Sequence, residues 1–307
     1  MKASLYLVLA TLFWSGNLVI GQAAATSMTP LELTFWRWTL AAVPLLLLAH
    51  FFEKPDWRAV LRRWPALLAL SALGMIGYTL LLYGALGYTS ALNASLITAA
   101  NPALIMVMAI VLLGERTTRL GWLGIGLGLL GVLLVLTRGE VARVFSLSIN
   151  TGELMMTGAI TVWGFYTILA RRLDVPAISA TAVQVVFATI MLAPFALAFN
   201  VRFPGTAAEG WSLAYIVVFP SLCSYLFWNL ALKTTAPGTA GNYLNLVVVF
   251  TAIITVVLGT PLSLVQIVGG FMVIAGVLLT GTRGQRGPAA RTTATAGPGG
   301  ADNRSPA

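Results

Sequence analysis

Charged side chains are scarce in this sequence. Lys, Arg, Asp and Glu make up 9% of its 307 residues, whereas hydrophobic residues make up 58%. A soluble domain carries about 25% charged residues, so most of this surface is expected to face lipid. The net charge of +9 would suit a nucleic-acid partner, but the cations lie in short gaps between apolar runs. That arrangement indicates orientation in a membrane, so we expect a lipid bilayer as partner and no nucleic acid.

Cysteine and histidine are almost absent. The single cysteine, Cys223, excludes a disulfide within the chain, and no zinc-binding spacing exists. The single histidine, His50, ends an apolar run and is expected to lie at the membrane interface rather than to act as a ligand or base. An intramembrane enzyme needs a nucleophile–base set or a metal cluster. We therefore expect neither an enzyme nor a cofactor or metal.

Long apolar runs fill most of the chain. A helix needs about 20 apolar residues to cross a hydrocarbon core about 30 Å thick, and lipid requires that each run be helical. The ten candidate spans are 3–21, 30–51, 66–86, 93–113, 120–137, 152–170, 178–199, 211–232, 239–258 and 263–280. The predicted fold class is therefore an all-α integral membrane protein with ten transmembrane helices.

The first span has an alternative interpretation as a secretory signal peptide. Lys2 is a minimal basic region, and the alanines at 23–25 resemble a cleavage site. However, Trp14, Gly16 and Asn17 interrupt the apolar run. The internal repeat described below also requires this helix, so we expect it to be retained.

Lys and Arg are distributed unevenly between the gaps. With the N-terminus inside, 14 of them fall on the inner side, three on the outer side (Arg138, Arg143 and Arg202), and Arg37 lies within a span. The positive-inside rule then places both termini in the cytoplasm. We expect a multi-pass protein of a bacterial-type inner (plasma) membrane, working as a monomer or weak homodimer.

A shift of 145 residues aligns the two halves of the chain. Segment 81–91 then falls on 226–236, Gly124 falls on Gly269, and Gly131 falls on Gly276. Because each half holds five spans, an odd number, the second half is inverted relative to the first. We expect a first five-helix repeat at 1–137, a connecting loop at 138–151, a second, inverted five-helix repeat at 152–280 and a disordered cytoplasmic tail at 281–307. Two inverted halves provide two near-equivalent packings, which favours alternating access over a purely structural role.

Several motifs together resemble the EamA branch of the drug/metabolite transporter superfamily. They are the Ala-x-x-Tyr-Thr-x-Ala segment from Ala85 to Ala91, the similar Ala-x-Lys-Thr-x-Ala segment from Ala231 to Ala236, the Leu-Gly-Glu turn at 113–115, the glycine helices at 124–134 and 269–279, and the Trp early in spans one and six. The second half departs from the usual pattern, because Thr260-Pro261 replaces the Gly-Glu turn and Leu246-Val247 replaces a proline. The resemblance implies export of amino acids or other metabolites.

The polar residues inside the spans are mostly uncharged amides and aromatics. Asn101-Pro102 is the sharpest signal, since Pro102 clashes with the carbonyl of Thr98 and a kink there frees backbone carbonyls near mid-membrane. The candidate substrate-binding residues are Asn101, Trp163, Tyr78, Tyr83, Trp228, Asn242, Asn245 and Trp14. For each residue the alternative is a hydrogen bond between helices or a place in an interfacial aromatic belt.

Two other residue groups have structural interpretations. The aromatics near span ends are expected in the interfacial belt. They are Trp36, Trp38, Trp64, Trp122 and Trp211. The glycines of span five, including Gly124 and Gly128, are expected to allow close helix packing.

Ionisable groups are rare in the spans. Glu32 and Arg37 are the ones clearly inside, both expected in the outer half of span two, with no carboxylate or His near mid-membrane. A proton-coupled drug antiporter usually needs such a group. We therefore expect export of small organic metabolites, amino acids with aromatic or other neutral side chains in particular, without a dedicated proton site. The alternative is a proton-coupled multidrug exporter of the same fold.

Overall fold

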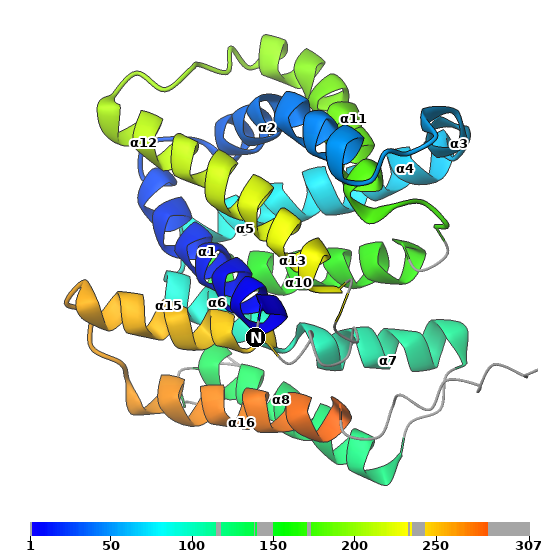
Figure 1. Ribbon diagram of the computed structural model, residues 1–307. Helices are drawn as coiled ribbons and strands as arrows, with labels where there is room; N and C mark the ends of the chain where they lie inside the picture. Colours follow the sequence, from blue (N-terminus) through cyan, green and yellow to red (C-terminus); the bar gives the residue numbers. More distant parts are fainter. Residues whose placement is uncertain are drawn as a thin grey trace, which may run out of the picture.

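The structure is a computed structural model that describes residues 2–114, 118–137, 139, 150–170, 173–232, 234 and 243–281. Within these residues the chain is built of helices joined by short connections, and no strand occurs (Figure 1). The expected tail at 281–307 lies outside the described residues apart from its first residue. Most of the expected connecting loop at 138–151 does so too.

The first half begins with α1 (Lys2–Ala24) and α2 (Pro30–Phe52), followed by the short α3 (Trp57–Arg62). The next span is continuous but irregular: α4 (Trp64–Leu70), the π-helical η1 (Ser71–Gly77) and α5 (Tyr78–Leu86). A fourth span is divided into α6 (Ala91–Ala99) and α7 (Asn101–Leu113), and α8 (Arg119–Leu136) follows.

The second half begins with α10 (Thr151–Ala170) and α11 (Ala177–Ala198). Its third span again contains a π-helical segment, in the order α12 (Ala207–Ile216), η2 (Val217–Cys223) and α13 (Ser224–Leu232). The half ends with α15 (Leu246–Val257) and α16 (Leu264–Gly281).

The helices fall on the predicted apolar runs, with ends that agree to within a few residues except in two runs. The span predicted to begin at 211 begins at Ala207. In the run predicted at 239–258, the described helix is α15, which begins at Leu246. Seven helices of the described chain are long and apolar enough to cross a membrane, and three further apolar helices are shorter, near 119–135, 246–257 and 264–279. The membrane fold is thus supported, while the count of ten spans stays a prediction.

The kink predicted at Pro102 is present. The helix breaks at Ala100, whose ψ is −7°, and Pro102 stands in the first turn of α7. A proline at this place loses no helical hydrogen bond, since the first amides of a helix have no partner in the helix. The two π-helical segments, η1 and η2, were not predicted, and they begin 146 residues apart.

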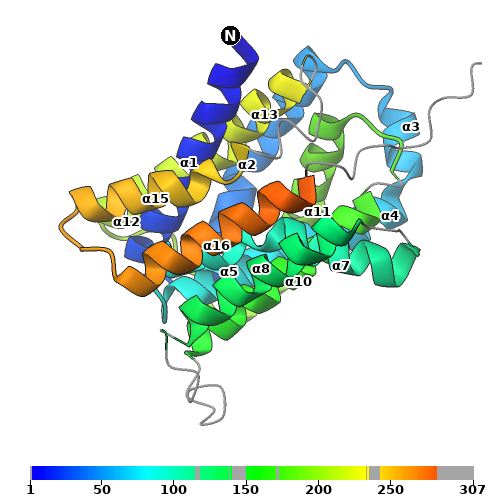
Figure 2. The same ribbon diagram turned by 90° about the horizontal axis from the view of Figure 1, so that it is seen from below.

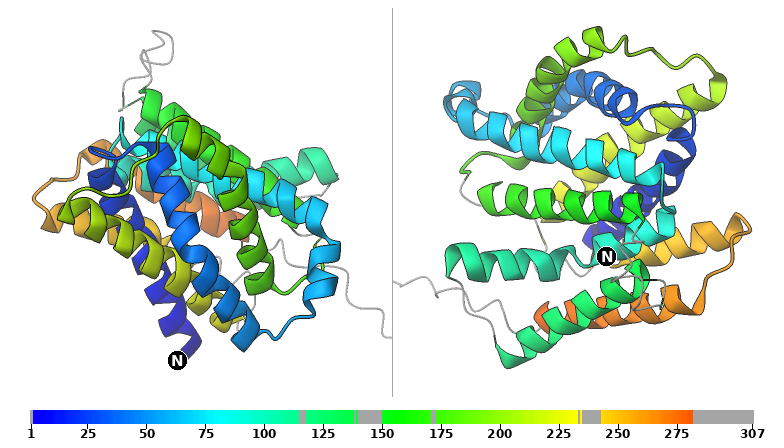
Figure 3. Two further views of the ribbon diagram at one scale, coloured as in Figure 1. Left: turned by 90° about the horizontal axis from the view of Figure 1, so that it is seen from above. Right: turned by 180° about the vertical axis from the view of Figure 1, so that it is seen from behind.

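Helices α2 and α11 lie side by side and run in opposite directions (Figure 3). After α2, the Glu53 carboxylate accepts hydrogen bonds from the backbone amides of Ile178 and Ser179 at the start of α11, at 2.8 and 2.7 Å. After α11, the Arg202 guanidinium donates to the Ser27 carbonyl, which precedes α2, at 2.7 Å. We name the two ends of the molecule after these contacts, the Glu53 end and the Ser27 end.

Helices α8 and α16 also pack closely (Figure 2). An ideal Cβ built on Gly276 would lie 2.6 Å from the Gly128 amide nitrogen, and one on Gly131 would lie 2.8 Å from the Gly269 carbonyl. The two helices therefore run antiparallel with their backbones in contact. The expectation that the glycines of span five allow close helix packing is confirmed.

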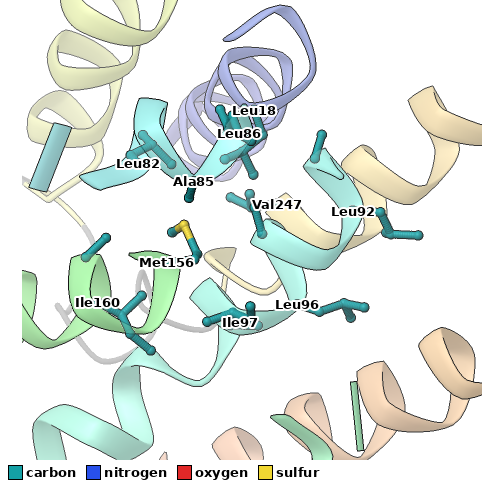
Figure 4. Packing of buried hydrophobic residues seen from close by; sticks show 14 of the residues in the cluster. Leu18, Leu82, Ala85, Leu86, Leu92, Leu96, Ile97, Met156, Ile160 and Val247 are labelled. Carbon is teal, nitrogen blue, oxygen red and sulfur yellow. The ribbon is translucent and has the colours of Figure 1, made fainter. Parts of the chain in front are cut away.

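The main apolar core lies where α1, α5, α6, α10 and α15 meet. Its buried side chains include Leu18, Leu82, Ile97 and Val247, with Met156 of α10 between them (Figure 4). This core lies toward the Ser27 end of the helices that carry the candidate site residues, and it fixes α1, α5 and α10 relative to one another.

Candidate substrate site

A buried arginine lies at the centre of a polar network. Arg37 of α2 is 4% exposed, its Nε donates a hydrogen bond to Ser221 Oγ of η2 at 2.8 Å, and its Nη1 donates to Tyr83 Oη of α5 at 2.8 Å. Tyr83 Oη in turn donates to Asn17 Oδ1 of α1 at 3.1 Å. The network therefore joins four helical segments that are far apart in the sequence.

The environment of the Arg37 cation is aromatic and neutral. Its guanidinium carbon lies 4.4 Å from the ring centroid of Trp38 and 5.9 Å from that of Tyr83. Within the described chain no carboxylate lies at ion-pairing distance from it. The nearby carboxylate of the same helix, Glu32, instead accepts from the Thr29 amide and lies 3.6 Å from Arg202. Among the described residues, this buried positive charge thus has hydrogen bonds and ring faces as partners but no carboxylate.

Two aromatic groups lie in this region of the bundle. In the first, Trp14 of α1 lies 6.1 Å from Tyr225 and 5.4 Å from Trp228 of α13, measured between ring centroids. In the second, Trp163 of α10 lies 4.9 Å from Tyr78 and 4.7 Å from Tyr166. These six rings are partly buried and come from both halves of the chain.

The two π-helical segments connect the aromatic groups with the arginine. Arg37 and Trp14 bond adjacent residues of η2, Ser221 and Pro220. The ring of Tyr166 lies against Gly74 of η1, next to the Met75 carbonyl that accepts from Trp38. The three features therefore belong to one region that combines a cation with aromatic rings. These groups suit a small solute that has an apolar side chain and a polar end.

The π-helical segments shape this site. The indole N–H of Trp14 donates to the Pro220 carbonyl of η2 at 3.3 Å, and that of Trp38 donates to the Met75 carbonyl of η1 at 2.7 Å. A π-helical turn leaves carbonyls without their usual helical partner, and such turns are frequent at functional sites. Gly74 of η1 also allows the ring of Tyr166 to approach, since a Cβ there would lie 2.5 Å from the ring.

The structure brings most of the predicted site residues together. Trp14, Tyr78, Tyr83, Trp163 and Trp228 belong to the network and the aromatic groups just described. In the described chain, no hydrogen bond or ring contact joins Asn101 or Asn245 to these five residues. Asn245 is buried just before α15. The Oδ1 atom of Asn101 is buried and accepts no hydrogen bond from the described residues. Asn242 lies outside the described residues.

A second polar cluster lies at the Ser27 end. Asn93 Nδ2 of α6 donates to Glu153 Oε1 of α10 at 2.9 Å, and Gln266 Nε2 of α16 donates to Asn93 Oδ1 at 2.8 Å. Asn93 and Gln266 line a cavity of about 700 Å³, together with Gln22 of α1 and residues of the 87–90 turn. Of the predicted site residues that the structure describes, none lines this cavity.

Three residues have roles that sequence reasoning missed. Arg37 was expected in the outer half of span two and was not proposed as a site residue, but it lies at the centre of the polar network. Trp38 was expected in the interfacial belt but is 1% exposed. Glu153 was not recognised as an ionisable group within the bundle, and it is also 1% exposed. The same signal in the sequence was available for Arg37 and Glu153. A single charged residue in or at the edge of an apolar run is costly in a membrane and indicates a functional site.

Comparison with known proteins identifies the family. The model of the EamA-like transporter family matches residues 1–137 and again residues 150–282. The uncharacterized transporter YyaM of Bacillus subtilis is 31% identical over 255 residues, which cover 81% of this chain and 84% of the relative. A probable terminal-alkyne amino-acid exporter of Streptantibioticus cattleyicolor is 28% identical, with 92% of this chain and 94% of the relative covered.

A solved structure supports the fold. It is described only as "Crystal structure of protein", is 21% identical and has a TM-score of 0.61, with 90% of this chain and 95% of that chain covered. The buried polar network around Arg37, the apolar helices and the match of the family model to both halves all agree with a membrane transporter of this family. The chain belongs to the EamA-like transporter family and is a multi-pass membrane transporter.

Proposed function

We propose that this transporter exports amino acids or similar small metabolites by alternating access, as a monomer or weak homodimer. The observation that carries the proposal is the pair of aromatic groups, around Trp14 and around Trp163, that flank a buried polar centre. Aromatic faces suit the apolar side chain of a metabolite, and hydrogen-bonding groups suit its polar end. The relative named as a probable amino-acid exporter supports the same substrate class. Asn101, Asn242 and Asn245 remain proposed site residues.

We propose further that ten spans form two inverted five-helix repeats, at 1–137 and 152–280. The antiparallel packing of α2 on α11 and of α8 on α16 supports this, because each pair joins equivalent spans of the two halves. The π-helical segments that begin 146 residues apart support it too. Inverted halves can exchange conformations around a shared central site, which is the physical basis of alternating access.

The orientation that we propose places both termini in the cytoplasm of a bacterial-type inner membrane, so the Ser27 end faces outward. Cysteine labelling in a Cys223→Ser background tests this orientation. Cysteines introduced at Thr26 and Thr206 are expected to react with an impermeant reagent from outside, and those at Thr118 and Leu173 from inside. Labelling of Thr26 only from the cytoplasmic side would show the orientation to be reversed.

Solute flux in proteoliposomes tests the transport function. We expect radiolabelled amino acids to move down their own gradient, with little response to an imposed pH difference. A protein that moves none of the twenty amino acids above the rate of empty liposomes would contradict the proposed substrate class.

The second candidate, a proton-coupled multidrug exporter, is favoured by one observation. Glu153 is a buried carboxylate within the bundle, at the Ser27 end, whereas Glu32 caps α2 and lies next to Arg202. If a pH gradient drives uphill accumulation of organic cations and Glu153→Gln abolishes it, this candidate replaces amino-acid export. Glu32→Gln is the matched control and should change stability rather than coupling.

A further inference from the structure

We propose that Arg37 binds the carboxylate of the transported solute, so that the substrates are small carboxylates with an apolar side chain. The inference rests on the proposed function and names the substrate class at the same site. It departs from the expectation of a site without charge, because the structure places a cation among the predicted aromatic residues.

The first argument is the uncompensated charge. An arginine inside a membrane protein is costly unless it is paired or lies against water, and such residues mark substrate paths. Arg202, at the Ser27 end, has the carboxylates of Glu209 and Glu32 at 2.8 and 3.6 Å. Arg37 is more deeply buried and has only neutral partners in the described chain. A bound carboxylate would supply the missing negative charge.

The second argument is the unused hydrogen-bonding capacity of the guanidinium. Nε is engaged with Ser221 and Nη1 with Tyr83, but Nη2 donates no hydrogen bond to the described chain. A guanidinium presents five N–H groups in a rigid plane, and the edge formed by Nη1 and Nη2 matches the two oxygens of a carboxylate. The network therefore orients Arg37, while Nη2 and the second N–H of Nη1 donate to no atom of the described chain.

The third argument is the position of the aromatic rings. The ring centroids of Trp38 and Tyr83 lie 4.4 and 5.9 Å from the guanidinium carbon of Arg37. Trp14 of the first aromatic group bonds Pro220, the residue before the Ser221 that Arg37 bonds. A solute whose carboxylate lies on Arg37 is thus next to aromatic rings. An amino acid with an aromatic or branched side chain fits this description, and so does the corresponding acid without the amine.

The alternative to substrate binding is that Arg37 has a structural role and only holds α1, α2, α5 and η2 together. This role predicts a loss of stability on substitution but no preference for carboxylates. The experiment must therefore separate recognition from folding, and it must not depend on the identity of the natural substrate.

Three probes with one phenyl ring provide that separation. L-phenylalanine carries both an amine and a carboxylate, 3-phenylpropionate carries the carboxylate alone, and phenethylamine carries the amine alone. Purified full-length protein in detergent is titrated with each probe, and the shift of the melting temperature reports binding. We expect L-phenylalanine and 3-phenylpropionate to stabilise the protein at millimolar concentrations and phenethylamine to have no effect.

Substitutions then assign the preference to Arg37. Arg37→Gln should weaken binding of both carboxylate probes about 10- to 100-fold, the range expected for a charge-assisted hydrogen bond. Arg37→Lys keeps the charge but loses the planar fork, so an intermediate loss is expected. Ser224→Ala is the control, since it removes a buried hydrogen bond to the Ala10 carbonyl but no partner of Arg37, and it should lower the melting temperature without changing the preference for carboxylates.

The outcomes are distinct. Three results would each overturn the inference: equal stabilisation by phenethylamine, no stabilisation by either carboxylate probe, or a Ser224→Ala protein that loses the preference as Arg37→Gln does. If Arg37→Gln fails to fold, the Arg37→Lys variant decides the question. An unchanged preference for carboxylates in Arg37→Lys would then also contradict the inference. Failure of the proposed function appears separately, as normal carboxylate binding without amino-acid flux in proteoliposomes.

Discussion

Around Arg37, helical segments are joined by side-chain hydrogen bonds, whereas α8 and α16 are joined by direct contact between their backbones. Arg37, Tyr83, Asn17 and Ser221 form the first region, which we call the polar centre. The second region, the glycine pair, consists of the surfaces of α8 and α16 that meet at glycines such as Gly131 and Gly276. Both regions join the first half of the chain to the second.

The two regions differ in how easily their contacts can be exchanged. Lipid is as apolar as a leucine side chain, so helices in a membrane associate through close packing or through hydrogen bonds. A hydrogen bond of the polar centre can be replaced by one to a substrate at little cost. A backbone contact of the glycine pair has no such substitute, because separation of the helices leaves a void. We therefore expect the glycine pair to move as one unit and the polar centre to rearrange.

The largest effect on stability is expected at the glycine pair. An added methyl group at Gly276 would lie 2.6 Å from the Gly124 carbonyl oxygen and from the Gly128 amide nitrogen, and neither backbone atom can rotate away. Gly276→Ala should therefore destabilise the protein by about 1–3 kcal/mol, as overpacking does elsewhere. The melting temperature of the purified protein in detergent measures this effect.

Gly126→Ala is the matched control for that prediction. Gly126 lies on α8, and a methyl group added there meets nothing within 4 Å. The same substitution should be neutral or slightly stabilising, because alanine favours a helix over glycine by about 1 kcal/mol. If the two variants melt at the same temperature, the close contact between α8 and α16 does not hold the helices together.

A smaller loss of stability is expected at the polar centre. Tyr83→Phe keeps the ring but removes the acceptor of Arg37 Nη1 and the donor to Asn17 Oδ1. Hydrogen bonds between membrane helices contribute on average about 0.6 kcal/mol, so we expect a loss of about 0.5–2 kcal/mol for the two. Tyr6→Phe is the control, since Tyr6 stacks on Phe227 and its hydroxyl has no hydrogen bond in the described chain. A Tyr83→Phe protein as stable as Tyr6→Phe would mean that the network contributes no stability.

The sequence predicted the features that depend on local composition. Apolar runs and short gaps located the helices to within a few residues in most cases, because lipid requires long apolar segments. Pro102 predicted the break between α6 and α7, since proline cannot continue a helix without losing a hydrogen bond. The glycines of span five predicted close packing because small residues allow backbones to approach.

The features that depend on tertiary contacts were not predictable in this way. The π-helical segments η1 and η2 have no simple sequence signature, and only η2 contains a proline. Trp38 was predicted at the interface because it lies next to other aromatics near a span end, but its indole donates to Met75 across the bundle. Arg37 was expected in the outer half of its span, but its role was missed because hydropathy does not show which side chains a residue contacts.

The smallest effect on stability, with a clear effect on transport, is expected at Asn101. Its Oδ1 is buried and accepts no hydrogen bond from the described chain, so Asn101→Ala leaves no donor of those residues unsatisfied, and a change within about 0.5 kcal/mol is expected. Loss of one hydrogen bond to a solute should lower flux per folded protein about 2- to 10-fold. Asn93→Ala is the matched control eight residues earlier, because Asn93 bonds both Glu153 and Gln266 and its removal should lower the melting temperature. If Asn101→Ala melts as low as Asn93→Ala while its flux per folded protein is unchanged, Asn101 belongs with the structural contacts and not with the substrate site.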